Sequence, residues 1–139
     1  MAVTLNHTII HAHDKAATTQ FLTEILGLEP PRTLGPFTVV QVGDTSLDFL
    51  ETEGEISSRH FAFLVSEAEF DEIFARILAH GLPYWADPSR REPNAINRWD
   101  DGRGLYFEDP NGHLLEILTR PYGSGGLDAE HPNPLLGRP

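Results

Sequence analysis

The chain has 139 residues, contains no cysteine and carries a formal net charge of −11 at pH 7. The lack of cysteine excludes disulfides, thiolate metal sites and a cysteine nucleophile. The acidity argues against a nucleic-acid partner, because affinity for phosphates depends on Lys and Arg. The apolar runs are too short to cross a bilayer, and the first residues lack the basic region of a signal peptide. We therefore expect a cytoplasmic protein without membrane or nucleic-acid partners, built as one domain or as two small repeats that share a core.

The first half of the chain predicts a strand, a helix and further strands. Residues 3–11 alternate around apolar positions, with His7 set among aliphatic side chains. Asp14 is a suitable N-cap for the helix that follows, and Gly27 is a suitable residue to end it. A strand, a turn, another strand and a polar linker are then expected at residues 37–42, 43–44, 46–51 and 53–58.

The second half begins with the same kinds of element. A strand is predicted at residues 60–65 and opens with His60. Ser66 and Glu69 have the spacing of a capping box, and the apolar periodicity of the next residues predicts a helix that stops at Gly81. A polar loop follows, and after it comes a second strand-rich region.

Three landmarks recur at nearly one offset along the chain. The pairs and their separations in positions are His7 and His60 (53), Asp14 and Ser66 (52), and Gly27 and Gly81 (54). This regularity predicts an internal repeat and an α+β fold of two βαβββ modules. The predicted parts are module one at 1–53, module two at 59–120, a single domain over 1–120, and a Gly/Pro-rich tail at 121–139.

The region after the polar loop predicts a β-hairpin with an unusual buried acid. Residues 109–112 read Asp-Pro-Asn-Gly, which suits a type I turn followed by a left-handed residue. In that register Tyr106 faces Glu116 across the hairpin. Glu116 lies between Leu114 and Leu118 on one face of a strand whose other face is also apolar. A carboxylate in such a place costs several kcal/mol unless another group pairs with it.

A metal ion is a candidate partner for this acid. Each half of the chain opens with a strand that carries a histidine, and the second half closes with Glu116. If the two halves fold equivalently and close on each other, His7, His60 and Glu116 converge. Two neutral imidazoles and one carboxylate are suitable ligands for a divalent metal that keeps open coordination positions.

These residues carry a family resemblance. His7, His60 and the motif Leu105-Tyr106-x-x-Asp109-Pro110-x-Gly112-x-x-x-Glu116 resemble the vicinal oxygen chelate superfamily. That group includes glyoxalase I, extradiol dioxygenases, fosfomycin-resistance enzymes and metal-free bleomycin-binding proteins. The resemblance covers roughly residues 3–120. It implies two βαβββ modules in a cupped mixed sheet around the metal, with His7, His60 and Glu116 as ligands, and a homodimer.

The resemblance leaves the reaction open. The hairpin is similar to part of the extradiol dioxygenase signature, including Tyr106, but Asn97, Arg98 and Trp99 stand where that signature has a catalytic histidine. This difference argues against ordinary catechol cleavage. A tyrosine ten residues before the glutamate is also similar to fosfomycin-modifying enzymes.

Other members of the superfamily imply a further ligand and several substrate contacts. Glyoxalase I has a fourth metal ligand near the place of Asp48, for which Glu51 is a rival. Tyr106 beside Glu116 is expected to hydrogen-bond a bound oxygen or to pass a proton. The residues expected to contact an anionic or aromatic substrate are Arg98, Trp99 and Arg103.

The expected function is therefore a metal-dependent enzyme that chelates a small oxygen-rich substrate, with Tyr106 and Glu116 in catalytic roles. Two histidines and one carboxylate favour Fe(II) and oxygenase chemistry, although Mn, Ni, Zn or Co also fit. Two alternatives stay open. One is a metal-free drug-binding protein, and the other is a lyase or thiol-transferase of the glyoxalase I or fosfomycin-resistance type.

Overall fold

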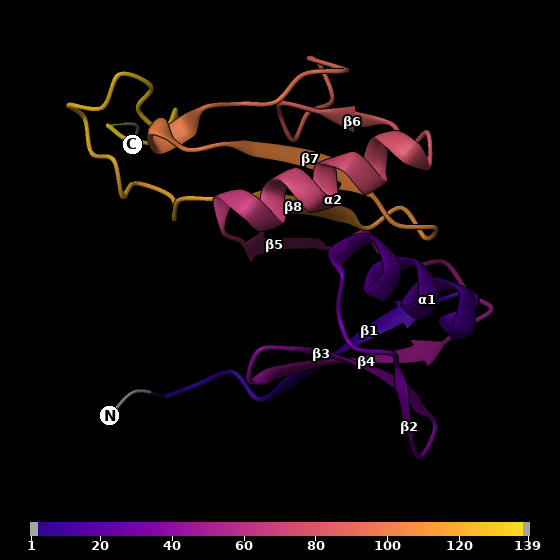
Figure 1. The fold of residues 1–139 in the computed structure, drawn as a ribbon. Coiled ribbons are helices and arrows are strands. Elements are labelled where there is room, and N and C mark those ends of the chain that lie inside the picture. The colour runs from indigo at the N-terminus through magenta and orange to yellow at the C-terminus, as the bar shows by residue number, and fades with distance from the viewer. Residues whose placement is uncertain (1–2, 138–139) are drawn as a thin grey trace. The chain divides into compact units, whose positions relative to one another are not determined.

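The computed structural model describes residues 3–137, which divide into two units. The first unit comprises the chain up to Ser58 together with residues 109–112, and the second comprises residues 59–108 and the chain from His113 onward. Each unit contains one long helix and one four-stranded sheet (Figure 1). The outermost residues of the predicted segments, 1–2 and 138–139, lie outside this description.

The elements follow each other in the same order in both units. Those of the first unit are β1 (His7–Ala12), α1 (Lys15–Leu26), β2 (Arg32–Leu34), β3 (Phe37–Val42) and β4 (Thr45–Glu51). Those of the second unit are β5 (His60–Leu64), α2 (Glu67–Ala79), β6 (Tyr84–Trp85), the short 3-10 helix η1 (Trp99–Asp101), β7 (Gly104–Glu108) and β8 (Leu114–Leu118).

The two sheets have the same topology. Their strand orders are β1-β4-β3-β2 and β5-β8-β7-β6. In each sheet the first strand of the module pairs in parallel with the last, and the remaining pairs are antiparallel. The predicted repeat of two βαβββ modules and the predicted α+β class are therefore confirmed.

Local side-chain chemistry explains where the helices begin and end. The Asp14 carboxylate accepts a hydrogen bond from the Ala17 N–H at 3.0 Å, which satisfies a free donor of the first turn of α1. Gly27 ends that helix in the left-handed conformation at φ 70°. Ser66 and Glu69 form the predicted capping box at the start of α2, each side chain accepting from the other residue's N–H.

The two faces of β1 differ in exposure. Ile10 and Ala12 are buried, whereas His7 and Ile9 on the other face are exposed. Alternate residues of a strand point to opposite sides of its sheet, so one side of β1 faces the core of the first unit. Helix α1 contacts β1, β3 and β4 of the same sheet. His7 therefore lies on the side of β1 that the core of its own unit leaves exposed.

In the second unit α2 covers one face of the sheet, and the candidate site lies on the other. The ring of Tyr84 packs edge-on against Phe74 of α2, with the ring centroids 5.2 Å apart, and Tyr84 pairs with Phe107 across β6 and β7. The side of the sheet that carries Phe107 therefore faces α2. Tyr106 and Glu116, which pair with each other, point to the opposite side.

The β7–β8 hairpin has the predicted turn and register. Gly112 adopts φ 85°, and its N–H donates to the Asp109 carbonyl at 3.1 Å. Tyr106 pairs with Glu116, as the turn chemistry predicted. The Asn111 side chain bonds within the first unit, where its oxygen accepts from the His13 N–H at 2.9 Å.

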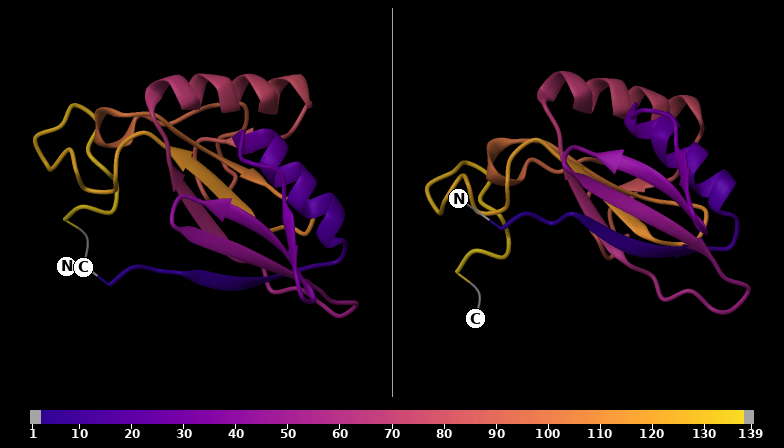
Figure 2. Two further views of the ribbon diagram at one scale, coloured as in Figure 1. Left: turned by 60° about the horizontal axis from the view of Figure 1, so that its bottom comes forward. Right: turned by 90° about the horizontal axis from the view of Figure 1, so that it is seen from below.

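The C-terminal segment, residues 120–137, belongs to the second unit and runs beside η1 (Figure 2). It contains no helix or strand, but its backbone is bonded to η1 at several points. Among residues 3–137, none of the helices combines the length and the apolar character that a bilayer crossing requires.

Candidate functional site

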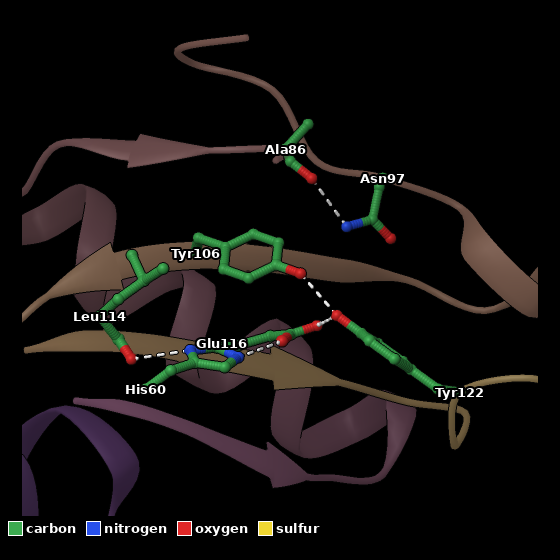
Figure 3. Close-up of polar contacts among 7 residues, drawn as sticks. All are labelled: His60, Ala86, Asn97, Tyr106, Leu114, Glu116 and Tyr122. Carbon is green, nitrogen blue, oxygen red and sulfur yellow. Dashed lines mark hydrogen bonds and ion pairs between the residues drawn. The ribbon is translucent and has the colours of Figure 1, made fainter. Parts of the chain in front are cut away.

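His60 and Glu116 meet on neighbouring parallel strands of the second unit. His60 opens β5 opposite Leu114, and Glu116 lies two residues further along β8. The His60 Nε2 atom lies 3.0 Å from Glu116 Oε1 (Figure 3). The Glu116 side chain is fully buried, as predicted, whereas the His60 side chain is 46% exposed. The buried acid thus has a histidine beside it, at the open side of the site.

The hydrogen bonds of His60 fix its tautomer. Its Nδ1 atom lies 3.0 Å from the Leu114 carbonyl oxygen, which can only accept, so Nδ1 carries a hydrogen. In a neutral imidazole the Nε2 atom then presents a lone pair toward the Glu116 carboxylate, which is also an acceptor. Two acceptors at 3.0 Å need a cation between them, either a proton or a metal ion.

The geometry of this pair fits a metal ion. Metal-bound histidines commonly donate their other ring N–H to a backbone carbonyl, as His60 does. Bonds of about 2.1 Å from one ion to two ligands at a right angle place the ligand atoms about 3.0 Å apart. The His60–Glu116 separation matches this value. An imidazole and a carboxylate also suit divalent transition metals.

Two tyrosines connect to the second oxygen of Glu116. The Tyr122 hydroxyl donates to Glu116 Oε2 at 2.7 Å, and the Tyr106 hydroxyl lies 2.5 Å from that of Tyr122 (Figure 3). Because Tyr122 gives its only hydrogen to the carboxylate, Tyr106 donates to Tyr122. Burial is the largest of the effects that raise the pKa of both phenols. Both hydroxyls therefore stay protonated and act as hydrogen-bond donors.

Burial also raises the pKa of Glu116 above its usual value, against the hydrogen bond from Tyr122 and the charge of His60, which lower it. Desolvation penalises the ionised carboxyl. The neighbours that favour ionisation therefore do not fully offset the burial. A cation bound beside Glu116 would supply the missing stabilisation of the carboxylate.

A pocket of about 490 Å³ opens over this network. Its walls are mainly aromatic and aliphatic, and all of its lining residues belong to the second unit. The lining residues are His60, Asp87, Pro88, Ser89, Trp99, Tyr106, Tyr122, Pro134 and Leu135. The Trp99 ring stands edge-on to both Tyr106 and Tyr122, with centroid separations of 6.2 and 6.1 Å. Such a pocket suits a small molecule whose apolar or aromatic body carries polar groups that reach the hydroxyl and imidazole groups of the lining.

Trp99 is held in place by Asn97, and these two residues, with Arg98, stand where the extradiol dioxygenase signature has its catalytic histidine. The Asn97 side-chain NH₂ donates to the Ala86 carbonyl at 2.9 Å (Figure 3). The Asn97 side-chain oxygen accepts from the backbone N–H of Trp99. Asn97 is largely buried. It therefore braces the loop before η1, and its neutral amide is no proton acceptor for general-base chemistry.

The C-terminal segment brings Tyr122 to the site because two acidic residues of η1 bind its backbone. The buried Asp100 carboxylate accepts from the N–H groups of Gly123 and Gly125, at 3.1 and 3.0 Å. Asp101 accepts from the backbone N–H of His131 at 2.8 Å. Sequence reasoning missed Tyr122 because it lies in a stretch without periodicity, and only the Gly-rich composition after it hinted at a close backbone contact.

The packing of the C-terminal segment against η1 gives a testable prediction. A Cβ atom on Gly125 would lie 2.9 Å from the Asp100 Cα and 3.1 Å from the Ala129 Cβ, so Gly125→Ala must displace backbone. We expect this variant to lose about 1–3 kcal/mol of unfolding free energy in urea titrations. Gly54→Ala is the matched control, since its Cβ would meet only Thr52 Oγ1 at 3.6 Å. Equal stability of the two variants would contradict the close packing of Gly125 against Asp100 and Ala129.

Arg98 and Arg103, both predicted to contact substrate, lie in different surroundings. Arg98 is exposed and does not line the pocket. The Arg103 guanidinium forms ion pairs with Glu67 and Asp71 of α2, at 2.7 and 2.8 Å. It also lies over the Phe70 ring, 4.4 Å from the centroid. Arg103 thus binds α2 to the start of β7, on the face of the sheet away from the pocket.

Arg103→Ala tests this role. The variant loses two ion pairs and a cation–π contact, so we expect the free energy of unfolding to fall by about 1–2 kcal/mol while ligand affinity stays at the parent value. Arg98→Ala serves as the control and should change stability by less than about 0.5 kcal/mol. Weaker ligand binding by Arg103→Ala at unchanged stability would instead support the predicted substrate contact.

His7 and Asp48, predicted as a ligand and a candidate fourth ligand, both belong to the first unit. They line a pocket of about 610 Å³ in that unit, together with Arg32 and Gln41. His7 Nδ1 bonds the Asn6 side-chain oxygen at 2.7 Å, and the buried Asp48 accepts from Ser46 Oγ. Within either unit, the described residues contain no group of three His, Asp or Glu side chains that could hold a metal ion. The second unit therefore assembles two of the three predicted ligands, His60 and Glu116.

The chain resembles solved structures over almost its entire length. The protein described as Oxidase ChaP-H2 is 61% identical, with a TM-score of 0.88, and the match covers 91% of this chain and 100% of that one. Oxidase ChaP-H1 is 58% identical, with a TM-score of 0.86, and the match covers 88% of this chain and 99% of that one.

More distant relatives extend the comparison. The metallothiol transferase FosB of Shouchella clausii (strain KSM-K16) is 28% identical over 83% of this chain and 79% of its own length. The glutathione transferase FosA of Serratia marcescens is 26% identical over 84% and 81%. The sequence model of the Glyoxalase/Bleomycin resistance protein/Dioxygenase superfamily matches residues 4–117. The chain therefore belongs to this superfamily, as its histidines and its hairpin motif had indicated.

Proposed function

We propose that this protein is a metal-dependent oxidase or oxygenase that binds a small, oxygen-rich aromatic molecule in the pocket of the second unit. The observation that carries the proposal is the pair of acceptors formed by His60 Nε2 and Glu116 Oε1, 3.0 Å apart, of which His60 lines that pocket. The high similarity to two proteins described as oxidases supports oxidative chemistry over the other reactions of the superfamily.

In this proposal the metal ligands are His60, Glu116 and His7, with Asp48 as a candidate fourth. Fe(II) is the favoured ion, because two histidines and one carboxylate with open positions suit non-haem iron chemistry. Mn, Ni, Zn and Co fit the same donor atoms. We further propose that the protein acts as a homodimer. The exposed apolar side chains Val3, Leu5 and Ile9, before and within β1, support a protein contact there.

The metal would supply Lewis-acid and redox chemistry to two neighbouring substrate oxygens. The chain's own residues would bind and orient the substrate. Trp99 offers an aromatic wall, and Pro134 and Leu135 of the C-terminal segment line the same pocket and would contact the ligand. Tyr106, whose hydroxyl stays protonated and bonds the Tyr122 hydroxyl, would donate its hydrogen bond to a ligand oxygen that takes the place of the Tyr122 hydroxyl.

Oxygen consumption is the direct test of the reaction class. Protein reconstituted anaerobically with Fe(II) would be mixed with a panel of catechols, hydroquinones and naphthalene diols in an oxygen electrode. We expect at least one diol to drive oxygen uptake by the parent, with a loss of about 100-fold or more in Tyr106→Phe or His60→Ala. A panel without any oxygen uptake, on protein with a full metal load, would contradict the oxidase proposal.

A thiol-transferase reaction is the second candidate, and the two fosfomycin-type relatives are the observation that favours it. It needs no dioxygen and consumes a thiol. Titration of glutathione or cysteine in the presence of an epoxide, under nitrogen, separates the two reactions. A metal-free binding protein differs from both, because it would bind its ligand equally well with and without a chelator.

A further inference from the structure

We propose that Tyr122 is an internal phenol that occupies the place of a ligand hydroxyl, so that a phenolic ligand binds by displacing the Tyr122 side chain from Glu116. This inference names the ligand class of the proposed function and rests on it for the location of the site. Tyr122 reaches the carboxylate from the C-terminal segment, outside the strands that carry His60, Tyr106 and Glu116.

The polar groups around the Tyr122 hydroxyl define what can replace it. Glu116 Oε2 accepts a hydrogen bond at 2.7 Å, so the replacing group must donate a hydrogen. The Tyr106 hydroxyl donates to the Tyr122 hydroxyl oxygen, so the replacing group must also accept a hydrogen bond. An ammonium group cannot accept and a carboxylate cannot donate, whereas a hydroxyl does both. The site therefore selects a hydroxyl group.

The apolar surroundings define what carries that hydroxyl. Trp99 stands edge-on to the Tyr122 ring, with an interplanar angle of 75°, and proline and leucine side chains line the same pocket. Aromatic rings pack favourably in edge-on and offset arrangements. A hydroxyl on an aromatic ring thus reproduces both the polar and the apolar contacts of Tyr122.

The Tyr122 side chain can leave the site while the rest of the segment stays bound. Three residues before it, the Thr119 N–H bonds the Arg103 carbonyl at 2.9 Å. Just after it, the Gly123 N–H bonds Asp100 at 3.1 Å. Tyr122 itself is 44% exposed. The chain is anchored on both sides of Tyr122, at Thr119 and at Gly123. Rotation of the half-exposed Tyr122 side chain is therefore enough to uncover Glu116 Oε2.

Phenol binding to Tyr122→Phe tests the displacement. The variant keeps the ring but loses the hydroxyl that competes for Glu116, so calorimetry in EDTA should show phenol bound about tenfold more tightly than by the parent. Toluene, which has no hydroxyl, should bind both proteins within about twofold. Tyr84→Phe removes a hydroxyl outside this pocket and should leave phenol affinity unchanged.

The outcomes separate this inference from the proposed function. Equal or weaker phenol binding by Tyr122→Phe would overturn the displacement, because Tyr122 would then be a fixed part of the ligand site. Toluene affinity that rises in Tyr122→Phe as much as phenol affinity does would also overturn it. The gain would then come from added room in the pocket and not from the freed Glu116 oxygen. The measurement uses protein in chelator, so failure of the metal or oxygen proposal leaves its result unaffected.

Discussion

Replacing Glu116 by glutamine is expected to abolish stoichiometric metal binding while leaving the metal-free fold at least as stable as the parent. The loss of a charged ligand should weaken metal affinity by more than about 100-fold, beyond the range found for residues that only orient ligands. The fold should tolerate the change because the amide has nearly the same shape and reduces the electrostatic conflict at His60.

The amide resolves that conflict through its two different ends. Its NH₂ group can donate to His60 Nε2, where the carboxylate now faces a lone pair at 3.0 Å. Its carbonyl oxygen can still accept from the Tyr122 hydroxyl. A neutral group also avoids the desolvation that raises the pKa of the fully buried Glu116. One added hydrogen bond is worth about 1 kcal/mol.

Urea titrations in EDTA and elemental analysis after metal loading measure the two effects separately. Glu108→Gln is the matched control, since Glu108 lies on β7 and pairs with Arg90 at 2.6 Å at an exposed position. It should keep the metal. A Glu116→Gln protein that unfolds more easily than the parent in EDTA would show that the carboxylate is already stably paired without an ion.

Phe70→Ala should cause a very large loss of stability. Phe70 is fully buried in α2, packs edge-on against Phe74 and lies beneath the Arg103 guanidinium. Its truncation should cost about 3–5 kcal/mol, a large part of the 5–15 kcal/mol that stabilises a typical domain. Because α2 supports the sheet that carries Tyr106 and Glu116, the variant should lose ligand binding at a lower temperature than the parent does.

Thermal and urea unfolding of Phe70→Ala measure this loss. Leu78→Ala on the same helix is the control, because Leu78 is 54% exposed and its truncation should cost less than about 1 kcal/mol. Similar losses in both variants would mean that α2 does not pack through Phe70.

Much of the fold could be predicted from local chemistry. The caps Asp14 and Ser66 and the turn at residues 109–112 each form hydrogen bonds that short-range spacing dictates, and all were found as predicted. Pairing of Tyr106 with Glu116 followed from the turn, because its length sets the register of the hairpin. The repeat was visible because both modules place the same landmarks at one offset.

The site was only partly predictable, because some of its members depend on long-range contacts. The burial of Glu116 followed from its apolar neighbours. Its bond to Tyr122 depends on where Asp100 and Asp101 hold the C-terminal segment, and no local pattern encodes that. Arg103 was predicted as a substrate contact from its sequence position, whereas its ion pairs with α2 depend on tertiary packing.

The metal content of protein purified without chelator tests the central claim most directly. His60→Ala and His80→Ala would be compared with the parent by elemental analysis. His80 is an exposed residue at the end of α2 whose ring bonds the Arg76 carbonyl, which makes it a matched control. The account predicts about one divalent ion per chain in the parent and in His80→Ala, and a loss of that ion in His60→Ala. Equal metal content in all three proteins, or a parent purified without chelator that holds no metal, would contradict a metal centre at His60 and Glu116.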